Sequence, residues 1–320
     1  AFIFFAADYN NLGDLAITIA QQKFLKDTLG EEYNVIKVNL SDTYDWTHTV
    51  KRLPKERVII TLIGGGNSGS AYGFIEIPRR YILRCFKNYR IISFPQTLIF
   101  DETEEAKAVQ NAFTSVANKC RNLTLVARER ASGEMYRSLS NAKVLLTPDI
   151  VFSYEKFVCK GAERDFGKAA LILRNDKEKA VSASFQAEAV HAVQRRFERV
   201  VSKDTCDIVY KNDNGQELLD GYIAELQTVG LVLTDRLHGM ILSYITKTPC
   251  IVFTNNNWKI TSTYETWLKD QNIVQIFNTE TQSLSDFVQL MDKMLQQPHD
   301  VSSDLSQKFD VLFESIKENS

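Results

Sequence analysis

The sequence predicts an α/β protein with two doubly wound, Rossmann-like domains that face each other across a cleft. Short apolar, β-branched runs alternate with longer amphipathic runs along nearly the whole chain. The alternation stops once, in the polar and aperiodic segment 153–167, and then resumes. Alternating strands and helices favour parallel sheets with helices on both faces. The chain of 320 residues is long enough for two domains of about 150 residues each.

The predicted first domain covers residues 1–155. Its apolar runs predict strands at 2–7, 34–38, 58–63, 90–94, 123–127 and 144–146, and its amphipathic runs predict helices at 14–29, 76–86, 103–119 and 129–139. The third helix opens with Thr103 among acidic residues, a pattern typical of a helix cap. We therefore interpret residues 101–104 as a helix start and not as an active site.

The predicted second domain covers residues 165–300. Its pattern predicts strands at 169–173, 207–210, 229–234, 250–253 and 274–276, and helices at 185–200, 215–227, 239–246, 261–270 and 284–295. The last segment, 301–320, holds a helix at 305–317 that is expected to pack back on the first domain.

Composition excludes several classes of function. The 38 Lys and Arg residues nearly balance the 40 Asp and Glu residues, so a net charge of −2 offers no general attraction to nucleic acid, and any anion site must be local. The five cysteines are dispersed, with no CxxC pair, which predicts reduced and mostly buried thiols in a cytoplasmic protein without a metal site.

The first residues predict a strand and not a secretion signal. Residues 1–7 are apolar but lack a basic leader, and no segment reaches the roughly 20 apolar residues that span a bilayer. The chain begins with Ala1 and not Met, which indicates processing or a late start.

Ligands in doubly wound folds bind beyond the carboxyl ends of the strands, so chemistry is expected where strands end. One strand runs into Gly64, Gly65, Gly66 and Asn67. This segment is either a tight turn or a nest of backbone N–H groups for an anion. It lacks the patterns of a P-loop or a dinucleotide-binding loop.

Two other strand ends carry titratable groups. Asp14 follows the first strand, where it either caps the next helix or acts as a carboxylate base. Asp235, Arg236 and His238 follow the predicted strand 229–234, and Arg236 has the planar fork that binds carboxylate or phosphate. His238 can move a proton near neutral pH. The alternative is a capped helix with a packed histidine, in which Asp235 and Arg236 pair with each other, but the strand-end position favours a functional site.

Further cations follow other strands. Arg128, Arg174 and Lys259 each lie after a predicted strand, and their recurrence predicts a cationic cleft. Arg80, Arg84 and Lys87 lie on one face of a predicted helix. A core helix with a basic solvent face is the favoured interpretation, and a peripheral membrane contact is the alternative.

Taken in order, these motifs resemble the polysaccharide pyruvyltransferase family. The resemblance covers residues 8–268, and its most specific part is the stretch 235–239, Asp-Arg-Leu-His-Gly. The other matching motifs are Asn11-x-Gly13-Asp14, Gly64-Gly65-Gly66-Asn67, Phe94-Pro95-Gln96-Thr97, Arg128-Glu129 and Pro148-Asp149, with Pro249 and Lys259 near the acceptor side.

The resemblance implies a GT-B-like fold and transfer of pyruvate from phosphoenolpyruvate to two hydroxyls of a hexose in a cell-surface or exopolysaccharide precursor. The product would be a cyclic ketal, formed without a cofactor or metal. His238 is the expected acid and Asp14 the expected base. The expected substrate-binding residues are Arg236, Arg128, Arg174, Lys259, Gly64, Gly65, Gly66, Asn67 and Leu237.

A lipid-linked acceptor would bring this cytoplasmic protein to the inner face of the membrane. Two alternatives remain open at this point: a nucleotide-sugar glycosyltransferase with the same architecture, and a non-catalytic protein that binds carbohydrate or nucleotide.

Overall fold

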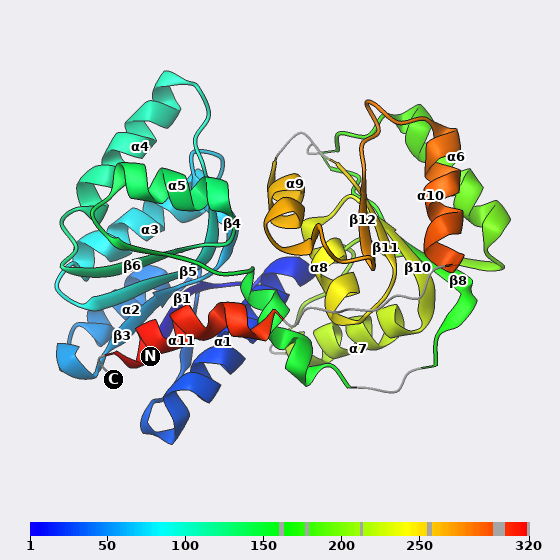
Figure 1. Cartoon of the computed structure of the whole chain (residues 1–320). Helices are drawn as coiled ribbons and strands as arrows, with labels where there is room; N and C mark the ends of the chain where they lie inside the picture. Colours follow the sequence, from blue (N-terminus) through cyan, green and yellow to red (C-terminus); the bar gives the residue numbers. More distant parts are fainter. Residues whose placement is uncertain (160–162, 177–178, 212–213, 255–257, 297–304, 319–320) are drawn as a thin grey trace. The chain divides into compact units, whose positions relative to one another are not determined.

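A computed structural model describes residues 1–318 apart from 160–162, 177–178, 212–213, 255–257 and 297–304 (Figure 1). The chain divides into two compact units. Unit 1 comprises Ala1–Tyr9, Asp14–Ser153 and Leu305–Ser320, and unit 2 comprises Asn10–Gly13 and Tyr154–Asp304. The described part of the C-terminal helix therefore belongs to unit 1, and the short segment Asn10–Gly13 belongs to unit 2.

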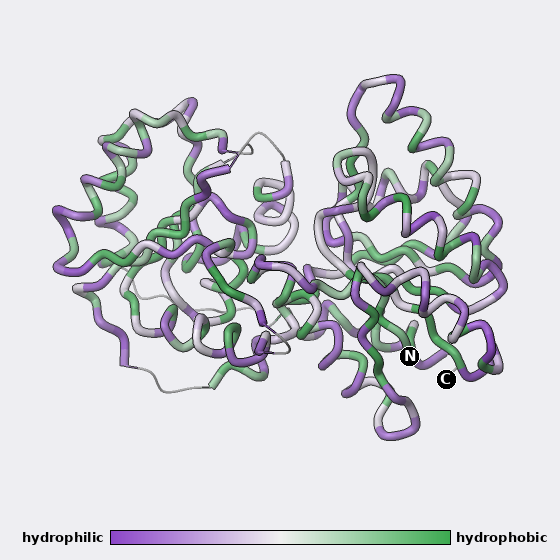
Figure 2. Tube along the Cα trace, turned by 180° about the vertical axis from the view of Figure 1, so that it is seen from behind, coloured by the Kyte–Doolittle hydropathy of each residue, from purple (hydrophilic) through white to green (hydrophobic). Residues whose placement is uncertain are grey.

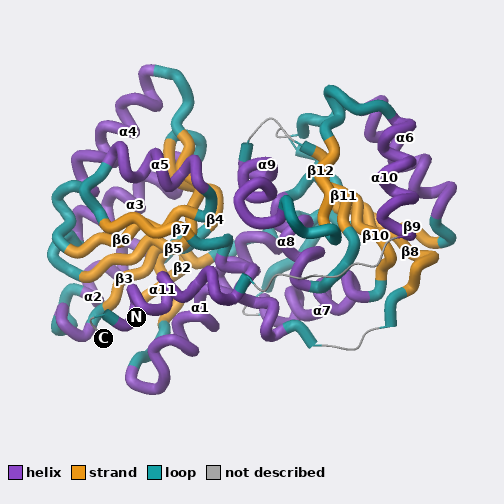
Figure 3. The backbone as a smooth tube through the Cα atoms, in the orientation of Figure 1, coloured by secondary structure: helices purple, strands orange, loops and turns teal. Residues whose placement is uncertain are grey.

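The strands of the unit 1 sheet are parallel and lie in the order β2-β1-β3-β5-β6-β7. Strand β4 pairs with the C-terminal part of β5. The strands are β1 (Phe2–Ala6), β2 (Ile36–Asn39), β3 (Ile59–Leu62), β4 (Gly65–Gly69), β5 (Arg90–Ile99), β6 (Asn122–Ala127) and β7 (Lys143–Leu146). The helices are α1 (Leu12–Leu29), α2 (Thr43–Val50), α3 (Gly73–Cys85), α4 (Glu104–Ala117), α5 (Arg130–Leu139) and α11 (Asp310–Lys317). Helices α3, α4 and α5 cover one face and α1 and α11 the other (Figure 3).

The glycine-rich segment forms the strand β4, so the tight turn, one of the two interpretations of this segment, is wrong. β3 pairs with the first part of β5, and β4 continues along the second part, from Gln96 to Ile99. Pro95 lies between the two parts, where a residue without an N–H group interrupts the ladder least. Gly69 has a φ of 110°, and a Cβ there would lie 2.7 Å from the carbonyl carbon of Ile99. Only glycine allows this close approach of two backbones.

The sheet of unit 2 is also parallel, in the order β12-β11-β10-β8-β9. Its strands are β8 (Asp165–Ile172), β9 (Arg199–Ser202), β10 (Val229–Thr234), β11 (Cys250–Phe253) and β12 (Val274–Phe277). Its helices are α6 (Ala183–Arg196), α7 (Gly215–Gln227), α8 (Leu237–Ile245), α9 (Lys259–Thr263) with a π-helical turn at Tyr264–Leu268, and α10 (Leu284–Gln296).

Two predictions for unit 2 are wrong. The strand expected at 207–210 lies outside any strand, and the edge strand is β9, which pairs with β8 through Val200 and Val201. Helix α6 ends at Arg196, whereas the predicted helix extended to residue 200 and so included the first two residues of β9. The segment 153–167 is not wholly irregular, because a 3₁₀ helix covers Ile150–Phe157 and β8 begins at Asp165.

Hydrophobic stretches run through both units (Figure 2), and many of their side chains are buried. In unit 2, Phe253, Phe277 and Phe287 are fully buried, with ring centroids 5.6–5.9 Å apart. Burying one such side chain contributes about 1.5–3 kcal/mol. The described residues include no helix long and apolar enough to cross a bilayer. The cysteines are less buried than predicted, because Cys250 is buried while Cys159 and Cys206 are exposed.

Candidate functional site

The strand order of unit 2 favours a ligand site between β8 and β10. The chain passes from β8 to β9 on one side and later returns to β10 on the other side of β8. Such a reversal opens a crevice at the carboxyl ends of the two strands. Arg174 lies just beyond β8, and Asp235, Arg236 and His238 lie just beyond β10. The structure therefore brings together the residues that the sequence placed at these two strand ends.

Arg174 and Arg236 converge on one carboxylate. Arg174 Nε lies 3.1 Å from Asp176 Oδ1, and Arg236 Nη1 lies 2.9 Å from Asp176 Oδ2. Arg236 Nη2 donates to Asp204 Oδ2 at 2.5 Å. Burial lowers the pKa of Arg236, but the hydrogen bond to Asp204 and the charge of that carboxylate raise it overall, so the guanidinium stays charged.

Threonine and glycine shape the turn that presents Arg236. Thr234 Oγ1 accepts a hydrogen bond from Arg236 N at 3.0 Å and donates one to Ile172 O at 2.8 Å. A Cβ on Gly239 would lie 3.1 Å from Thr234 Cβ and closer still to its hydroxyl. Glycine is therefore needed for α8 to begin directly against the ends of β8 and β10.

Asp235 is a buried carboxylate that does not pair with Arg236 through any contact among the described residues. Its Oδ1 accepts a hydrogen bond from Arg174 N at 2.8 Å, and its side chain is 1% exposed. Burial raises the pKa of Asp235 to about 6, and the hydrogen bond from the Arg174 backbone opposes that shift. Asp235 thus ties the end of β10 to the end of β8.

We expect the Asp235→Asn variant to change how stability depends on pH. Because the folded-state pKa of about 6 exceeds the ordinary value of 3.8, the folded protein holds this proton more tightly than the unfolded chain. The contribution of Asp235 to stability is present below pH 4 and falls by roughly 3 kcal/mol as pH rises through 6. Urea unfolding at pH 4.5 and 7.5 measures the free energy of unfolding of both proteins. The wild-type value should exceed that of the variant by more at pH 4.5 than at pH 7.5. An equal difference at both pH values would contradict this assignment.

His238 lies in the first turn of α8 and packs against the glycine of the N-terminal motif. A Cβ on Gly13 would lie 2.8 Å from His238 Cγ and closer still to Nδ1. Two hydrogen bonds, each donated by a backbone N–H group, hold the segment that contains Gly13 within unit 2. Leu12 N donates to Thr205 O at 2.8 Å, and Tyr210 N donates to Asn10 Oδ1 at 2.9 Å. The imidazole is thus positioned by a residue more than 200 positions away in the chain.

Asp14 belongs to unit 1 and is not the cap of α1. Asn11 fills that place, because its Oδ1 accepts a hydrogen bond from Gly13 N at 2.9 Å. Asp14 Oδ2 accepts a hydrogen bond from the Tyr9 hydroxyl at 2.9 Å. Burial and the neighbouring Asp14 raise the pKa of Tyr9, so the phenol stays protonated and keeps donating to the carboxylate.

The other predicted binding residues of unit 1 lie in a buried polar network. Gly64 N donates to Gln21 Oε1 at 3.1 Å and Gly65 lies in the pairing of β4 with β5, so the Gly64 amide is used within the fold. The anion nest at the remaining amides stays a prediction. Gly65 is buried, whereas Gly66 and Asn67 are half-buried. Asn67 Oδ1 accepts hydrogen bonds from Arg79 Nη2 at 2.5 Å and from Gln96 Nε2 at 3.2 Å.

Arg128 does not join Arg174 and Arg236 in the unit 2 cluster. It is buried in unit 1 with 1% exposure, and its Nη1 lies 2.7 Å from Asp149 Oδ2. Its Nε donates to Thr97 Oγ1 at 2.6 Å. These contacts support a structural role for Arg128. Lys259 begins α9 and Leu237 begins α8 in unit 2, and both are half-buried. The polar residues 255–257 before Lys259 lie outside the described part of the chain.

With this geometry in hand, comparison with known proteins assigns the chain to a family. The model of the polysaccharide pyruvyl transferase family matches residues 11–257, which span both units and the cluster around His238. The chain belongs to this family. The match begins at Asn11 and includes the segment 235–239, so it covers the N-terminal and the C-terminal motifs alike.

Two relatives illustrate the similarity. General stress protein 30 of Bacillus subtilis (strain 168) is 34% identical over 320 residues, covering 98% of this chain and 90% of the relative. Pyruvyl transferase 1 of Schizosaccharomyces pombe is 27% identical over 285 residues, covering 82% of this chain and 68% of the relative.

Solved structures show the same fold at low identity. Protein KP1_0663 of Klebsiella pneumoniae aligns with a TM-score of 0.60 and 18% identity, covering 86% of this chain and 92% of the other. UDP-GlcNAc 2-epimerase of Methanocaldococcus jannaschii aligns with a TM-score of 0.56 and 10% identity, covering 99% of both chains. Like these proteins, this pyruvyl transferase family member has the two parallel-sheet domains of the GT-B class.

Sequence reasoning missed the acidic partners of the site. Asp176 and Asp204 hold the two arginines, yet neither follows a predicted strand directly. Asp204 lies after β9, a strand that the sequence pattern does not predict, because the predicted helix 185–200 covers its first two residues. The spacing Arg174-Asn175-Asp176 was the one available signal, because a carboxylate two residues after an arginine can fold back onto it.

The basic helix face has the predicted form in part, because α3 ends at Cys85 and Lys87 lies beyond it. Arg84 and Lys87 are exposed, Ile82 and Leu83 are buried opposite them, and Arg80 lies 3.8 Å from Glu76. This agrees with a core helix that has a basic solvent face. The membrane contact stays a prediction.

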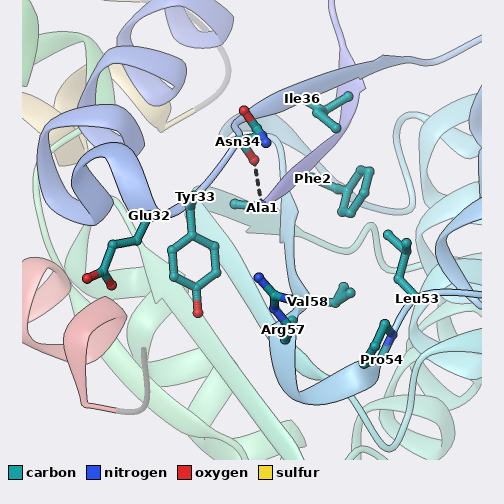
Figure 4. A pocket seen from close by; sticks show the side chains of 10 residues that line it. All are labelled: Ala1, Phe2, Glu32, Tyr33, Asn34, Ile36, Leu53, Pro54, Arg57 and Val58. Carbon is teal, nitrogen blue, oxygen red and sulfur yellow. Dashed lines mark hydrogen bonds between the residues drawn. The ribbon is translucent and has the colours of Figure 1, made fainter.

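A hollow of about 580 Å³ lies at the edge of the unit 1 sheet where the strands begin (Figure 4). It is lined by the start of β1 and β2 and by the residues before β3, namely Ala1, Phe2, Glu32, Tyr33, Asn34, Ile36, Leu53, Pro54, Arg57 and Val58. These are amino-terminal ends of parallel strands, whereas doubly wound folds bind ligands at the carboxyl ends. We assign no role to this hollow.

Proposed function

We propose that this protein transfers pyruvate from phosphoenolpyruvate to two hydroxyls of a hexose in a polysaccharide precursor and releases phosphate. The observation that carries the proposal is the carboxylate of Asp176, whose two oxygens are held by Arg174 and Arg236. Phosphoenolpyruvate has one carboxylate and one phosphate, so it needs cations that converge in this way. Asp176 thus occupies the kind of place that the substrate anion would take.

The ion pairs with Asp176 and Asp204 balance the charge of the two arginines. Two guanidinium groups buried without counterions would cost several kcal/mol. Asp176 is 42% exposed and Asp204 is 14% exposed. The more exposed Asp176 is therefore the carboxylate that an incoming anion replaces, while Asp204 stays with Arg236.

The proposed chemistry adds a proton to the methylene carbon of phosphoenolpyruvate and an oxygen to the adjacent carbon. His238 donates the proton, and the first sugar hydroxyl attacks while losing its own proton to Asp14. The bond from the central carbon to the phosphate oxygen then breaks, and phosphate leaves. The second hydroxyl attacks the same carbon, closes the ketal and gives its proton to the released phosphate, while the proton held by Asp14 replaces, through solvent, the one that His238 donated. The hydrogen bond from Tyr9 fixes the orientation of the Asp14 carboxylate.

We expect Asp176→Ala to bind phosphoenolpyruvate more tightly than the wild type. The variant no longer has a carboxylate that competes with phosphoenolpyruvate for Arg174 and Arg236. Because a partly exposed ion pair contributes little, the affinity for phosphoenolpyruvate should rise by about fivefold. Calorimetric titration with phosphoenolpyruvate measures this, with Asp292→Ala as the control, because Asp292 pairs with Arg196 on the surface of the same unit.

A nucleotide-sugar donor is the competing possibility, since the structural neighbour from Methanocaldococcus jannaschii is named for UDP-GlcNAc. Titration with UDP-GlcNAc under the same conditions separates the two donors. Binding of UDP-GlcNAc together with no binding of phosphoenolpyruvate would overturn the proposal.

A further inference from the structure

Unit 1 has its own reversal of strand order, between β1 and β3. The chain passes from β1 to β2 on one side and then to β3 on the other, and β4 continues the path of β3. β1 ends at Ala6 and β4 ends at Gly69, so Tyr9 and Tyr72 each lie three residues beyond a strand end. Both tyrosines therefore lie at the edge of the sheet where a ligand is expected.

An aromatic pair lies at this edge, with Tyr72 half-buried and Phe74 exposed. Tyr72 and Phe74 have ring centroids 6.2 Å apart with their planes at 85°. Phe74 is 61% exposed in the first turn of α3, a helix in which Ile75 and Ile82 are buried and Ile77 is also exposed. A phenylalanine that is held by a second ring yet left open to solvent indicates a contact surface.

Polar groups of a fixed orientation accompany the pair. Arginine only donates hydrogen bonds, so the bond from Arg79 requires that Asn67 presents Oδ1 to it. Gln96 Nε2 donates to the same oxygen, and the Asn67 Nδ2 hydrogens are then available for a ligand. Arg79 itself is 2% exposed and lies 3.2 Å from Glu76 Oε2, which makes the orientation rigid. Asp14 adds a carboxylate positioned by Tyr9.

The charge around the pair argues against an anionic surface as its partner. Asp101 Oδ2 accepts a hydrogen bond from Ser70 Oγ at 2.8 Å, which brings a carboxylate to the exit of β4. The nearby cations Arg79 and Arg80 are directed at Glu76. A hexose fits better, because it has an apolar C–H face for an aromatic ring and hydroxyls for an amide and a carboxylate.

We propose that Tyr72 and Phe74 form an aromatic platform for the hexose ring of the acceptor, with Asn67 as a hydrogen-bond donor beside it. The inference rests on the proposed function for the identity of the reaction but not for the existence of the sugar site. Tyr72 and Phe74 are binding residues in this scheme, and Arg79 is a positioning residue that acts through Asn67.

The test is binding of 4-nitrophenyl hexosides of gluco, galacto and manno configuration, followed by saturation-transfer NMR. Phe74→Ala should weaken binding of the recognised hexoside about five- to tenfold, because one aromatic contact is removed. Phosphoenolpyruvate affinity should stay unchanged. Phe166→Ala is the matched control, since Phe166 is 65% exposed on β8 of unit 2. It should leave hexoside binding unaltered.

The outcomes separate this inference from the proposed function. Hexoside binding that depends on Phe74, with no phosphate released from phosphoenolpyruvate, would leave the sugar platform standing and overturn the reaction. Wild-type protein that binds none of the hexosides at millimolar concentration would overturn the platform, whatever the reaction. A Phe74→Ala variant that binds hexosides as tightly as the wild type but no longer co-sediments with phosphatidylglycerol vesicles would also overturn the platform. That result would assign Phe74 to contact with a lipid surface.

Discussion

Arg236→Ala should lower kcat/KM for phosphoenolpyruvate by about 100-fold or more, equivalent to ~3 kcal/mol. The substitution removes a guanidinium that contacts both Asp176 and Asp204. Without it these two carboxylates would face the substrate anion and repel it, so the loss exceeds that of a simple hydrogen bond. Arg236→Lys should recover only part of the activity, because an ammonium lacks the planar fork that reaches two carboxylates.

The measurement is steady-state phosphate release with phosphoenolpyruvate and a hexoside acceptor. Arg196→Ala is the matched control, because Arg196 pairs with Asp292 on the surface, where the two side chains are 48% and 45% exposed. It should behave as the wild type. Near wild-type kcat/KM in Arg236→Ala would remove Arg236 from the anion site.

Gly13→Ala should lower kcat by about 100-fold while leaving phosphoenolpyruvate affinity nearly unchanged. The added methyl group would lie 2.8 Å from His238 Cγ and closer to Nδ1, so the imidazole must move away from its place in the first turn of α8. Gly13 lies in α1, where alanine is otherwise favoured over glycine by about 1 kcal/mol. Any loss of activity therefore arises from the displaced histidine and not from a weaker helix.

Gly221→Ala provides the control for that substitution. Gly221 lies in α7, and a Cβ there would meet no atom within 4 Å. This variant should keep full activity and unfold at a slightly higher temperature. Wild-type kcat in Gly13→Ala, confirmed on folded protein by circular dichroism, would show that the position of His238 does not limit the reaction.

The sequence predicted the unit 2 site because its residues are local. Asp235, Arg236 and His238 follow one strand without interruption, and Arg174 follows the neighbouring strand, so parallel pairing of β8 with β10 brings them together. The period of apolar residues is enough to locate such strands, and the carboxyl-end rule is enough to locate the site.

Residues that depend on long-range packing were harder to place. Arg128 follows a strand as Arg174 does, yet Asp149 and Thr97 surround it inside unit 1. Strand-end position alone cannot distinguish a cation that faces a ligand from one that pairs internally. The glycine segment suggests a tight turn or an anion nest because glycine allows unusual backbone angles, whereas Gly69 lies in a strand that needs close approach to Ile99.

The contact between Gly13 and His238 was equally out of reach of sequence patterns. The two residues belong to motifs at opposite ends of the matched family region, and neither pattern indicates that the two lie together. Asn10–Gly13 folds with unit 2 because of its bonds to Thr205 and Tyr210. Tyr210 itself lies in the segment 207–210 that the pattern predicts as a strand.

The most direct test of pyruvyl transfer is to incubate the protein with phosphoenolpyruvate and the panel of 4-nitrophenyl hexosides. Released phosphate and the mass of the sugar product are measured together. The account predicts one phosphate released per sugar modified, with a mass increase that matches a pyruvate ketal, and no product from UDP-hexoses. A product that forms only with a UDP-hexose, or phosphate release without any modified sugar, would contradict it.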